Sequence, residues 1–470
     1  MNLRSQWKMF VPLFVFALIW MMPSPQGLSI QAWHFLAVFF AVLVGLVLEP
    51  IPAALLGLIG ISVASVLGLV GKTPAANIKW ALSGFSNNII WLIFASIMFA
   101  MGYKKTGLGK RISLIMVKYM GKSTLGLGYA IAFADLILAP FMPSNTARSA
   151  GTIYPIAINI PILFNSTPEN EPRKMGAYLV WVGIAISTVT SSMFYTGLTT
   201  NMLAADLIQK GANITLEWGA WAKIMIPLML PLFLITPLLA YVIFPPTQKH
   251  SPSASFWAQE ELMKMGSITF KEMMMASFAT FALILWVFGK ELNVDATVAA
   301  ISIVALMVLS NIITWDDVIG NKGAWNVLVW FATLVALAAG LKEVGILTKK
   351  KKKAELSLMG LTPTMLMISM IVASFVLHYF FASLTAHAVA LFPIFIAFSV
   401  KFISPEQLVT FLILFSGTLG VMGIITPYGT GPSPIWYGSG YISQGRWWFL
   451  GAIFGGLYLG AILLGVFIFF

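Results

Sequence analysis

Residues 144–149 read Ser-Asn-Thr-Ala-Arg-Ser, and residues 383–388 read Ser-Leu-Thr-Ala-His-Ala. Each is a short polar run inside a long apolar stretch, and the two runs lie 239 positions apart. The same interval separates Arg148 from His387, the basic residue that follows the Thr of each run by two positions. Polar side chains in strongly apolar surroundings are costly and usually functional, so the two runs are predicted to be paired parts of one binding site.

The composition places the chain in a membrane. Of its 470 residues 59% are hydrophobic and 9% are charged, and the mean hydropathy is +0.90. A soluble globule of this size could not hide that much apolar surface. All spans are expected to be helices, because an open sheet leaves backbone groups unpaired in lipid. The sequence therefore predicts an all-α polytopic membrane protein.

The charge and the absence of cysteine narrow the possible partners. A net charge of +12 is attributed to the cationic flanks of the spans, which meet anionic headgroups, so membrane lipid and not nucleic acid is the expected partner. The chain has no cysteine, which excludes disulfides and thiolate metal sites. No catalytic triad, metal-ligand cluster or phosphate loop stands out, and neither a cofactor nor a metal is expected.

The first apolar run begins at Phe10, behind Arg4 and Lys8, and no small-residue cleavage site precedes Pro23. It is therefore predicted to be a retained first helix and not a signal peptide. The N-terminus does not resemble an organelle transit peptide, which favours a bacterial plasma membrane as the location.

Apolar runs that are bounded by charged residues or by Pro and Gly predict about eleven spans. These are 10–28, 30–48, 51–71, 86–120, 176–206, 217–245, 270–289, 294–313, 325–347, 406–440 and 446–470. The remaining segments, 122–163 and 361–402, each have two apolar arms around one of the polar runs. Arms of about fifteen to twenty residues barely cross a hydrocarbon core of about 30 Å, so both segments are predicted to be re-entrant helical hairpins.

The repeat extends beyond the hairpins. Residues 102–108 read Gly-Tyr-Lys-Lys-Thr-Gly-Leu, and residues 340–346, 238 positions later, read Gly-Leu-Lys-Glu-Val-Gly-Ile. Residues 196–201 and 426–432 carry Gly or Pro inside apolar helices and are predicted helix breaks. Each repeat then has five crossings and one hairpin, and an odd number of crossings inverts the second copy. Inverted repeats with hairpins and broken helices are typical of secondary transporters that bind their substrate near the midplane.

The positive-inside rule favours a cytoplasmic N-terminus. With that orientation the following basic residues lie on the cytoplasmic side: Lys104, Lys105, Lys110, Arg111, Lys118, Lys122, Arg173 and Lys174. The inversion then places Lys342 and the lysine run 349–353 outside, against the rule. That run is either a solvated connector or a positively charged segment that attracts anionic solutes electrostatically.

These features resemble the divalent anion/sodium symporter (DASS) family. The resemblance rests on Ser-Asn-Thr at 144–146, Ser-Leu-Thr at 383–385 and Thr-Pro-Tyr-Gly-Thr at 426–430, and the organisation matches from about residue 30 to residue 470. It implies a homodimer in which a transport domain moves as an elevator against a scaffold. The implied scaffold comprises 1–121 and 246–360, and the implied transport domain comprises 122–245 and 361–470.

The resemblance also implies that the two hairpin tips bind the carboxylates of C4 to C6 dicarboxylates or citrate, with the helix breaks completing the site. The substrate-binding residues expected on this basis are Ser144, Asn145, Thr146, Ser383, Leu384, Thr385, Gly197, Thr199, Thr200, Asn201, Thr426, Pro427, Gly429 and Thr430.

Three residues depart from the sodium-coupled pattern of the family. Leu384 stands where those members have the Asn of the second tip, and Arg148 and His387 stand where they have small or hydroxyl residues. In the symporters, co-bound Na⁺ supplies positive charge for the substrate. A guanidinium stays charged and cannot leave with the substrate, so an empty carrier would have to move an uncompensated positive charge through the membrane.

The sequence therefore predicts a sodium-independent, obligate exchanger of dicarboxylates such as 2-oxoglutarate, malate, succinate and fumarate, with Arg148 and His387 in place of sodium ions. Alternatively, Arg148 is a structural ion-pair partner of Asp135, and His387 is a packing histidine, as His378 is expected to be. The protonation state of His387 stays open, because imidazole titrates near neutral pH.

Two rival functions remain at this point. Sodium-coupled symport of di- or tricarboxylates on the same scaffold is the closer one. A membrane-embedded enzyme with Arg148 and His387 as acid–base groups is more distant, and no nucleophile or metal partner is evident near them. The chain is therefore not expected to be an enzyme.

Overall fold

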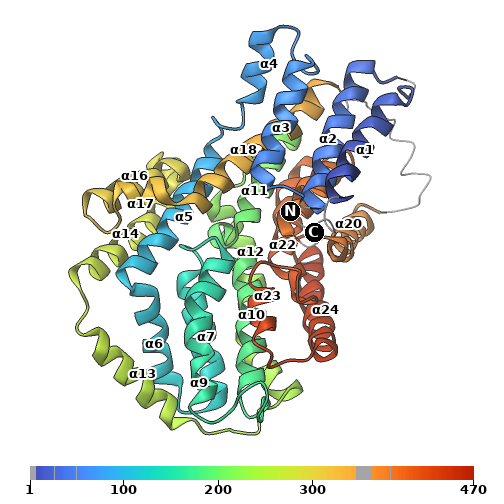
Figure 1. The fold of residues 1–470 in the computed structure, drawn as a ribbon. Coiled ribbons are helices and arrows are strands. Elements are labelled where there is room, and N and C mark those ends of the chain that lie inside the picture. The colour runs from blue at the N-terminus through green and yellow to red at the C-terminus, as the bar shows by residue number, and fades with distance from the viewer. Residues whose placement is uncertain (1–6, 26, 49, 346–361, 382) are drawn as a thin grey trace.

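The computed structural model describes residues 7–25, 27–48, 50–345, 362–381 and 383–470. In these ranges every regular element is a helix, apart from one isolated bridge between Ser123 and His250 (Figure 1). Nine of the described helices are long and apolar enough to cross a membrane. The all-α membrane class is thus confirmed, whereas the count of eleven spans stays a prediction. The lysine run 349–353 lies outside the described residues.

The elements of the first half follow the predicted order. They are α1 (Trp7–Met21), α2 (Ile30–Leu48), α3 (Ala53–Val66), α4 (Pro74–Ala81), α5 (Asn88–Thr106), α6 (Leu108–Met120), α7 (Thr124–Leu138), the π-helix η2 (Thr146–Ile153), α8 (Tyr154–Ala157), α9 (Asn159–Ile162), α10 (Gly176–Met193), η3 (Tyr195–Gly197), α11 (Thr199–Ala212) and α12 (Trp218–Ile243). The first hairpin thus runs from α7 through η2 to α9, and the first broken helix runs from α10 to α11.

The second half has a corresponding hairpin followed by a corresponding broken helix, although its hairpin contains a 3₁₀ turn and not a π-helix. Its elements are α13 (Pro252–Met265), α14 (Phe270–Val287), α15 (Gly289–Leu292), α16 (Ala296–Leu309), α17 (Trp315–Gly320), α18 (Lys322–Glu343), α20 (Pro363–Leu377), η4 (His378–Phe380), α21 (Leu384–Phe402), α22 (Pro405–Val421), η5 (Met422–Ile424), α23 (Ser433–Gly438) and α24 (Gln444–Phe469). The second hairpin consists of α20, η4 and α21. By length alone α21 is long enough to span, so its re-entrance stays a prediction.

The predicted span 86–120 is wrong as a single element. Gly107, with φ of 80°, ends α5 and turns the chain into α6. With 13 residues α6 is only about 20 Å long, too short to span. Its inward face includes Arg111, whose Nε lies 2.6 Å from Glu272 Oε1 of α14 in a buried ion pair. α6 is therefore a packed amphipathic helix and not the second half of a span.

Helix α13 is a further element that the sequence did not predict, as are the short helices α4 and α17. It lies in the connector between α12 and α14 and packs along α6, and Figure 1 shows it running below α6 and the first hairpin. Ser251 Oγ, at its N-terminus, donates to the carbonyl of Gly121 at 2.8 Å. Helices α6 and α13 together therefore flank the first hairpin on one side.

The two broken helices cross at the centre of the molecule. All 18 residues of α10 are buried. A Cβ placed on Gly420 of α22 would lie 2.4 Å from the backbone nitrogen of Ser192, so only glycine permits this approach. Ser192 Oγ also donates to the carbonyl of Gly417 at 2.6 Å. The crossing places the predicted breaks of both halves in one buried region, and both breaks are confirmed as interruptions of helix.

Candidate functional site

The first hairpin tip turns the chain from α7 into a π-helix. Seven residues separate α7 from η2, which begins at Thr146 within the polar run, and Ser144 Oγ accepts a hydrogen bond from the backbone N–H of Ala147 at 3.2 Å. Ser144 and Thr146 are half-buried, whereas Asn145 is buried. π-Helical turns are rare and occur frequently at functional sites. The hydroxyls of Ser144 and Thr146 are thus the accessible polar groups of this tip.

This tip contacts the break in the other half of the chain. Asn145 Nδ2 donates to Thr430 Oγ1 at 2.8 Å. A Cβ on Gly431 would lie 2.1 Å from Thr146 Oγ1, so the absence of a side chain at 431 lets the tip approach. The predicted neighbours Asn145, Thr146 and Thr430 are therefore brought together.

The first break lies against the same hairpin. Thr199 donates from its backbone N–H to the carbonyl of Pro143 at 2.9 Å, and its Oγ1 lies 3.2 Å from the same oxygen. Asn201 Nδ2 bridges the break by donating to the carbonyls of Ser191 and Phe194, at 2.8 and 3.1 Å. These bonds fix the start of α11 beside the tip of the first hairpin.

Arg148 fills a cage of oxygen atoms behind the first tip. Its side chain is fully buried, and its Nη1 donates to the carbonyls of Met142 and Gly197 at 2.7 and 2.8 Å. Its Nη2 lies 3.0 Å from Ser191 Oγ and 3.3 Å from Thr190 Oγ1. The guanidinium thus ties together the hairpin, α10 and the first break, and it has no surface on which to touch a substrate directly.

Arg148 also forms an ion pair with Asp135, as the alternative interpretation of this residue predicted. Its Nε lies 3.1 Å from Asp135 Oδ2 on the first arm of the hairpin, and both side chains are buried. The expectation of an uncompensated positive charge is therefore wrong, because the neighbouring carboxylate balances the guanidinium. Whether Arg148 takes the place of sodium is a separate prediction that this pair does not exclude.

The second hairpin repeats this arrangement with different side chains. His387 Nε2 lies 3.1 Å from Ser374 Oγ, and both residues are fully buried. Ser374 follows Asp135 by 239 positions, the interval that also separates His387 from Arg148. In both hairpins the basic residue of the second arm therefore binds a polar residue placed thirteen positions earlier on the first arm.

His378 has a role that the sequence analysis missed, since it was expected only to pack. Its Nε2 lies 2.7 Å from the carbonyl of Gly429 in the second break. A carbonyl oxygen only accepts, so Nε2 carries the proton. His378 thus connects its hairpin to its break as Arg148 does through Gly197. The repeat places His378 opposite Ala139 of the first hairpin, a difference that marks the residue but does not identify its partner Gly429.

Replacing His378 tests this connection. His378→Phe keeps a ring of similar size but leaves the Gly429 carbonyl buried without its donor, which is expected to lower the free energy of unfolding by about 1–3 kcal/mol. Thermal unfolding in detergent measures the loss. His250→Phe is the control, because His250 is an exposed histidine outside the hairpins. An unfolding temperature equal to that of the control would contradict the role of His378.

The second tip begins α21 and packs with it against α11. Ser383 caps the helix and is half-buried, whereas Leu384 and Thr385 are buried. Of the second break, Thr426, Gly429 and Thr430 are buried and Pro427 is half-buried. The two tips share no hydrogen bond within the described residues, and the second hairpin is joined to its break through His378.

The helix starts at the tips and breaks suit an anion. Helix starts at Thr146, Thr199 and Leu384 lie at the tips and breaks, and helix N-termini carry partial positive charge. Among the described residues, no group of three or more His, Cys, Asp or Glu could hold a metal ion. Buried Thr200 Oγ1 and Thr426 Oγ1 have no hydrogen-bond partner in the described part of the chain. The substrate-binding roles of these residues stay predictions.

Paired hairpins and paired broken helices, set around a buried polar centre in an apolar helical chain, define a secondary transporter. The sequence matches the family described as the sodium:sulfate symporter transmembrane region over residues 3–469. The chain belongs to this family, the DASS family of multi-pass membrane transporters, and is not an enzyme.

Two similar relatives are the L-tartrate/succinate antiporters of Shigella flexneri and of Escherichia coli strain K12. Each is 45% identical over 472 residues, and the match covers 97% of this chain and 96% of the relative. A solved structure, the YdaH transporter of Alcanivorax borkumensis, is similar with a TM-score of 0.56 and 16% identity, covering 88% of this chain and 96% of that one. This last likeness concerns the fold alone.

Proposed function

We propose that the protein is a sodium-independent antiporter that exchanges dicarboxylates across the bacterial plasma membrane. Succinate and L-tartrate are the first candidates, because the relatives at 45% identity are antiporters of these two anions. Malate, fumarate and 2-oxoglutarate share the two carboxylates and belong to the same proposal. Citrate is a further candidate, and the family name adds sulfate to the anions to be compared.

The observation that carries this proposal is the cage around Arg148. Carbonyl and hydroxyl oxygens together with a carboxylate are the ligands that hard cations prefer, and here a guanidinium occupies them. A covalently held cation cannot be released with the substrate, so the substrate would move without a co-transported ion at this position. His387 would have the corresponding position in the second half, beside Ser374.

The ion pair with Asp135 changes the reason for obligate exchange. Since Arg148 and Asp135 balance each other, the positive character of the empty site would come from the helix starts and hydroxyls at the tips. Without an anion these polar groups would pass through the hydrocarbon core unsatisfied, which is costly. A loaded site would cross more readily than an empty one, and the return step would therefore need a second anion.

We further propose that the movement is an elevator and that the protein is a homodimer, as the resemblance implies. In this movement the segments 122–245 and 361–470 would slide against the rest. Asp206 of α11, which accepts a hydrogen bond from Asn87 at the start of α5, would then exchange partners during transport. The particle mass in detergent tests the dimer, and a monomer would contradict it.

Counterflow in proteoliposomes tests the proposed function. Labelled succinate is expected to enter vesicles only when they contain an unlabelled dicarboxylate, at the same rate with Na⁺ or with K⁺ outside. A competition panel of L-tartrate, malate, fumarate, 2-oxoglutarate, citrate and sulfate then ranks the substrates. Uptake into empty vesicles driven by an inward Na⁺ gradient would instead establish symport, the rival function that the family name keeps in view.

A further inference from the structure

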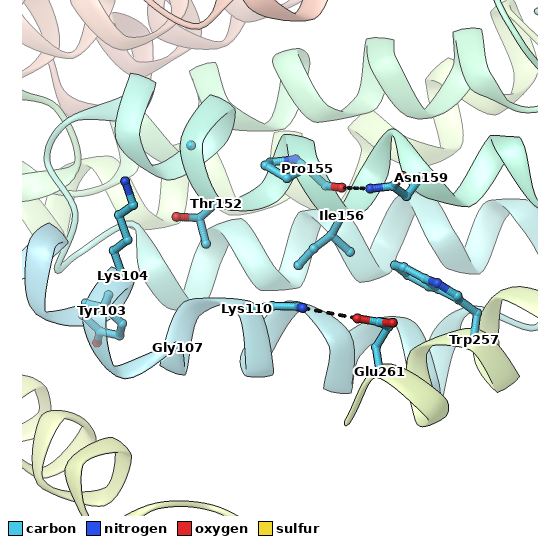
Figure 2. A pocket seen from close by; sticks show the side chains of 11 residues that line it. Tyr103, Lys104, Gly107, Lys110, Thr152, Pro155, Ile156, Asn159, Trp257 and Glu261 are labelled. Carbon is cyan, nitrogen blue, oxygen red and sulfur yellow. Dashed lines mark hydrogen bonds and ion pairs between the residues drawn. The ribbon is translucent and has the colours of Figure 1, made fainter. Parts of the chain in front are cut away.

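A groove lies between α6, α13 and the second arm of the first hairpin (Figure 2). It encloses about 300 Å³, which is at the lower end of the range for small-molecule sites, about 300–1,000 Å³. Tyr103 and Trp257 provide aromatic walls, and Thr152 of the π-helix contributes a hydroxyl. The space is therefore adequate for a small organic anion, and its walls combine apolar and polar groups.

Two lysines reach into this groove from the same side. Figure 2 shows Lys104 at one end of the groove beside Thr152, and Lys110 pointing along the groove toward Glu261. Lys104 is exposed and has no carboxylate partner in the described part of the chain. Its neighbour Lys105, by contrast, pairs with Asp317 of α17 and does not line the groove. The groove therefore holds one ammonium group that no carboxylate neutralises.

Lys110 can turn away from its carboxylate at little cost. Its Nζ lies 3.2 Å from Glu261 Oε2, whereas Lys264 Nζ lies 2.7 Å from the other oxygen, Oε1. Hydrogen bonds from Lys264 and Lys110 hold the pKa of Glu261 below its usual range, so this carboxyl is ionised at neutral pH. Lys264 stays bound to Glu261 if Lys110 leaves, and the Lys110 ammonium is then free to bind a carboxylate in the groove.

The groove is close to the first tip. Thr152 and Gly151 lie in the π-helix that begins at Thr146, and Thr152 Oγ1 donates back to the carbonyl of Ala147 at 3.2 Å. Its other walls, α6 and α13, belong to the part of the chain predicted to be scaffold. An anion in the groove would thus lie beside the proposed transport site and contact both proposed domains.

We infer that this groove is a second binding site for small dicarboxylates, in which Lys104 and Lys110 bind the two carboxylates before the anion passes to the first hairpin tip. The class of ligand rests on the proposed function. With a cytoplasmic N-terminus the groove faces the cytoplasm, so it would hold the internal anion that the exchange step requires. The ammonium groups raise the local concentration of that anion.

Cysteine labelling tests the inference, because the native chain has no cysteine to give background. Thr152→Cys introduces one thiol into the groove of the full-length protein, reconstituted in vesicles of zwitterionic lipid. An anionic thiosulfonate reagent is expected to react faster than a cationic one of similar size, and succinate is expected to slow the labelling. Asn159→Cys provides a second reporter in the same groove.

Lysine substitutions then show whether Lys104 and Lys110 cause the faster reaction of the anionic reagent and the protection by succinate. Lys104→Gln and Lys110→Gln are each expected to slow the anionic reagent by about fivefold, the scale of one charge a few ångströms away in water, and to abolish protection by succinate. Lys105→Gln is the matched control and is expected to change neither. Protection that survives in the two groove variants, or is lost equally in the control, overturns the inference.

The counterflow assay keeps the two proposals separable. Exchange without protection of the groove thiol refutes the second site and leaves the proposed function intact. Protection without exchange refutes the proposed antiport and leaves a dicarboxylate-binding groove.

Discussion

Arg148→Ala is expected to abolish exchange and to lower the free energy of unfolding by about 3–5 kcal/mol, the usual cost of leaving one partner of a buried ion pair alone. Asp135 would remain buried without its cation, and the carbonyls of Met142 and Gly197 would lose their shared donor. Counterflow of labelled succinate measures the first effect, and denaturant unfolding in detergent measures the second.

A double variant separates charge from packing. Arg148→Ala combined with Asp135→Asn removes both charges, so a large part of the lost stability is expected to return while exchange stays absent. Recovery of exchange together with stability would restrict Arg148 to a structural role. Retention of full exchange in the single variant would contradict any need for a cation in the cage.

Gly431→Ala is expected to weaken substrate binding by about 10–100-fold with little change in global stability. The added Cβ would lie 2.1 Å from Thr146 Oγ1, and Thr is β-branched and stiff at χ1, so the hydroxyl must move away from the tip. A hydrogen bond to a charged group contributes about 1.5–3 kcal/mol, which corresponds to that range of affinity. Gly431 itself is exposed, and the atom that the added Cβ would displace is the end of one side chain, so global stability is expected to change little.

The measurement is the concentration of succinate that half-saturates counterflow. Gly438→Ala is the matched control, because a Cβ at the end of α23 meets nothing within 4 Å. Exchange by Gly431→Ala that matches this control would mean that Thr146 takes no part in binding.

The sequence was most informative where the structure depends on the length of apolar runs and on the Gly and Pro residues that interrupt them. The predicted span 30–48 coincides with α2, and both predicted breaks interrupt their helices, because Gly and Pro act locally on the backbone. Helix α6 was wrongly merged into the span 86–120, and α13 was not predicted. Both helices carry charged residues and lie against neighbours, so an apolar run does not set their bounds, and only tertiary contacts such as Arg111 with Glu272 account for their position.

The site was predictable from the repeat, within limits. Equal spacing brought Arg148 and His387 to attention, and their partners Asp135 and Ser374 prove to be spaced in the same way. The spacing of residues along the chain does not show whether a buried cation has a counter-charge. The partners of Arg148 come from the first hairpin, α10 and the first break, which only the folded structure brings together. His378 was missed because its bond to Gly429 joins residues 51 positions apart, a distance that no local pattern reports.

The unequal chemistry of the two hairpins has a consequence for the resting protein. One half attaches its hairpin to its break with a single five-donor side chain, and the other uses an imidazole donor, with a second imidazole behind its tip. In a carrier built from inverted copies, the two halves exchange conformations between the inward-facing and outward-facing states, and here the two halves differ in sequence. The inward-facing and outward-facing states would therefore differ in free energy, and the unloaded carrier would mostly populate one of them. That population would determine from which side of the membrane the empty carrier binds its next substrate.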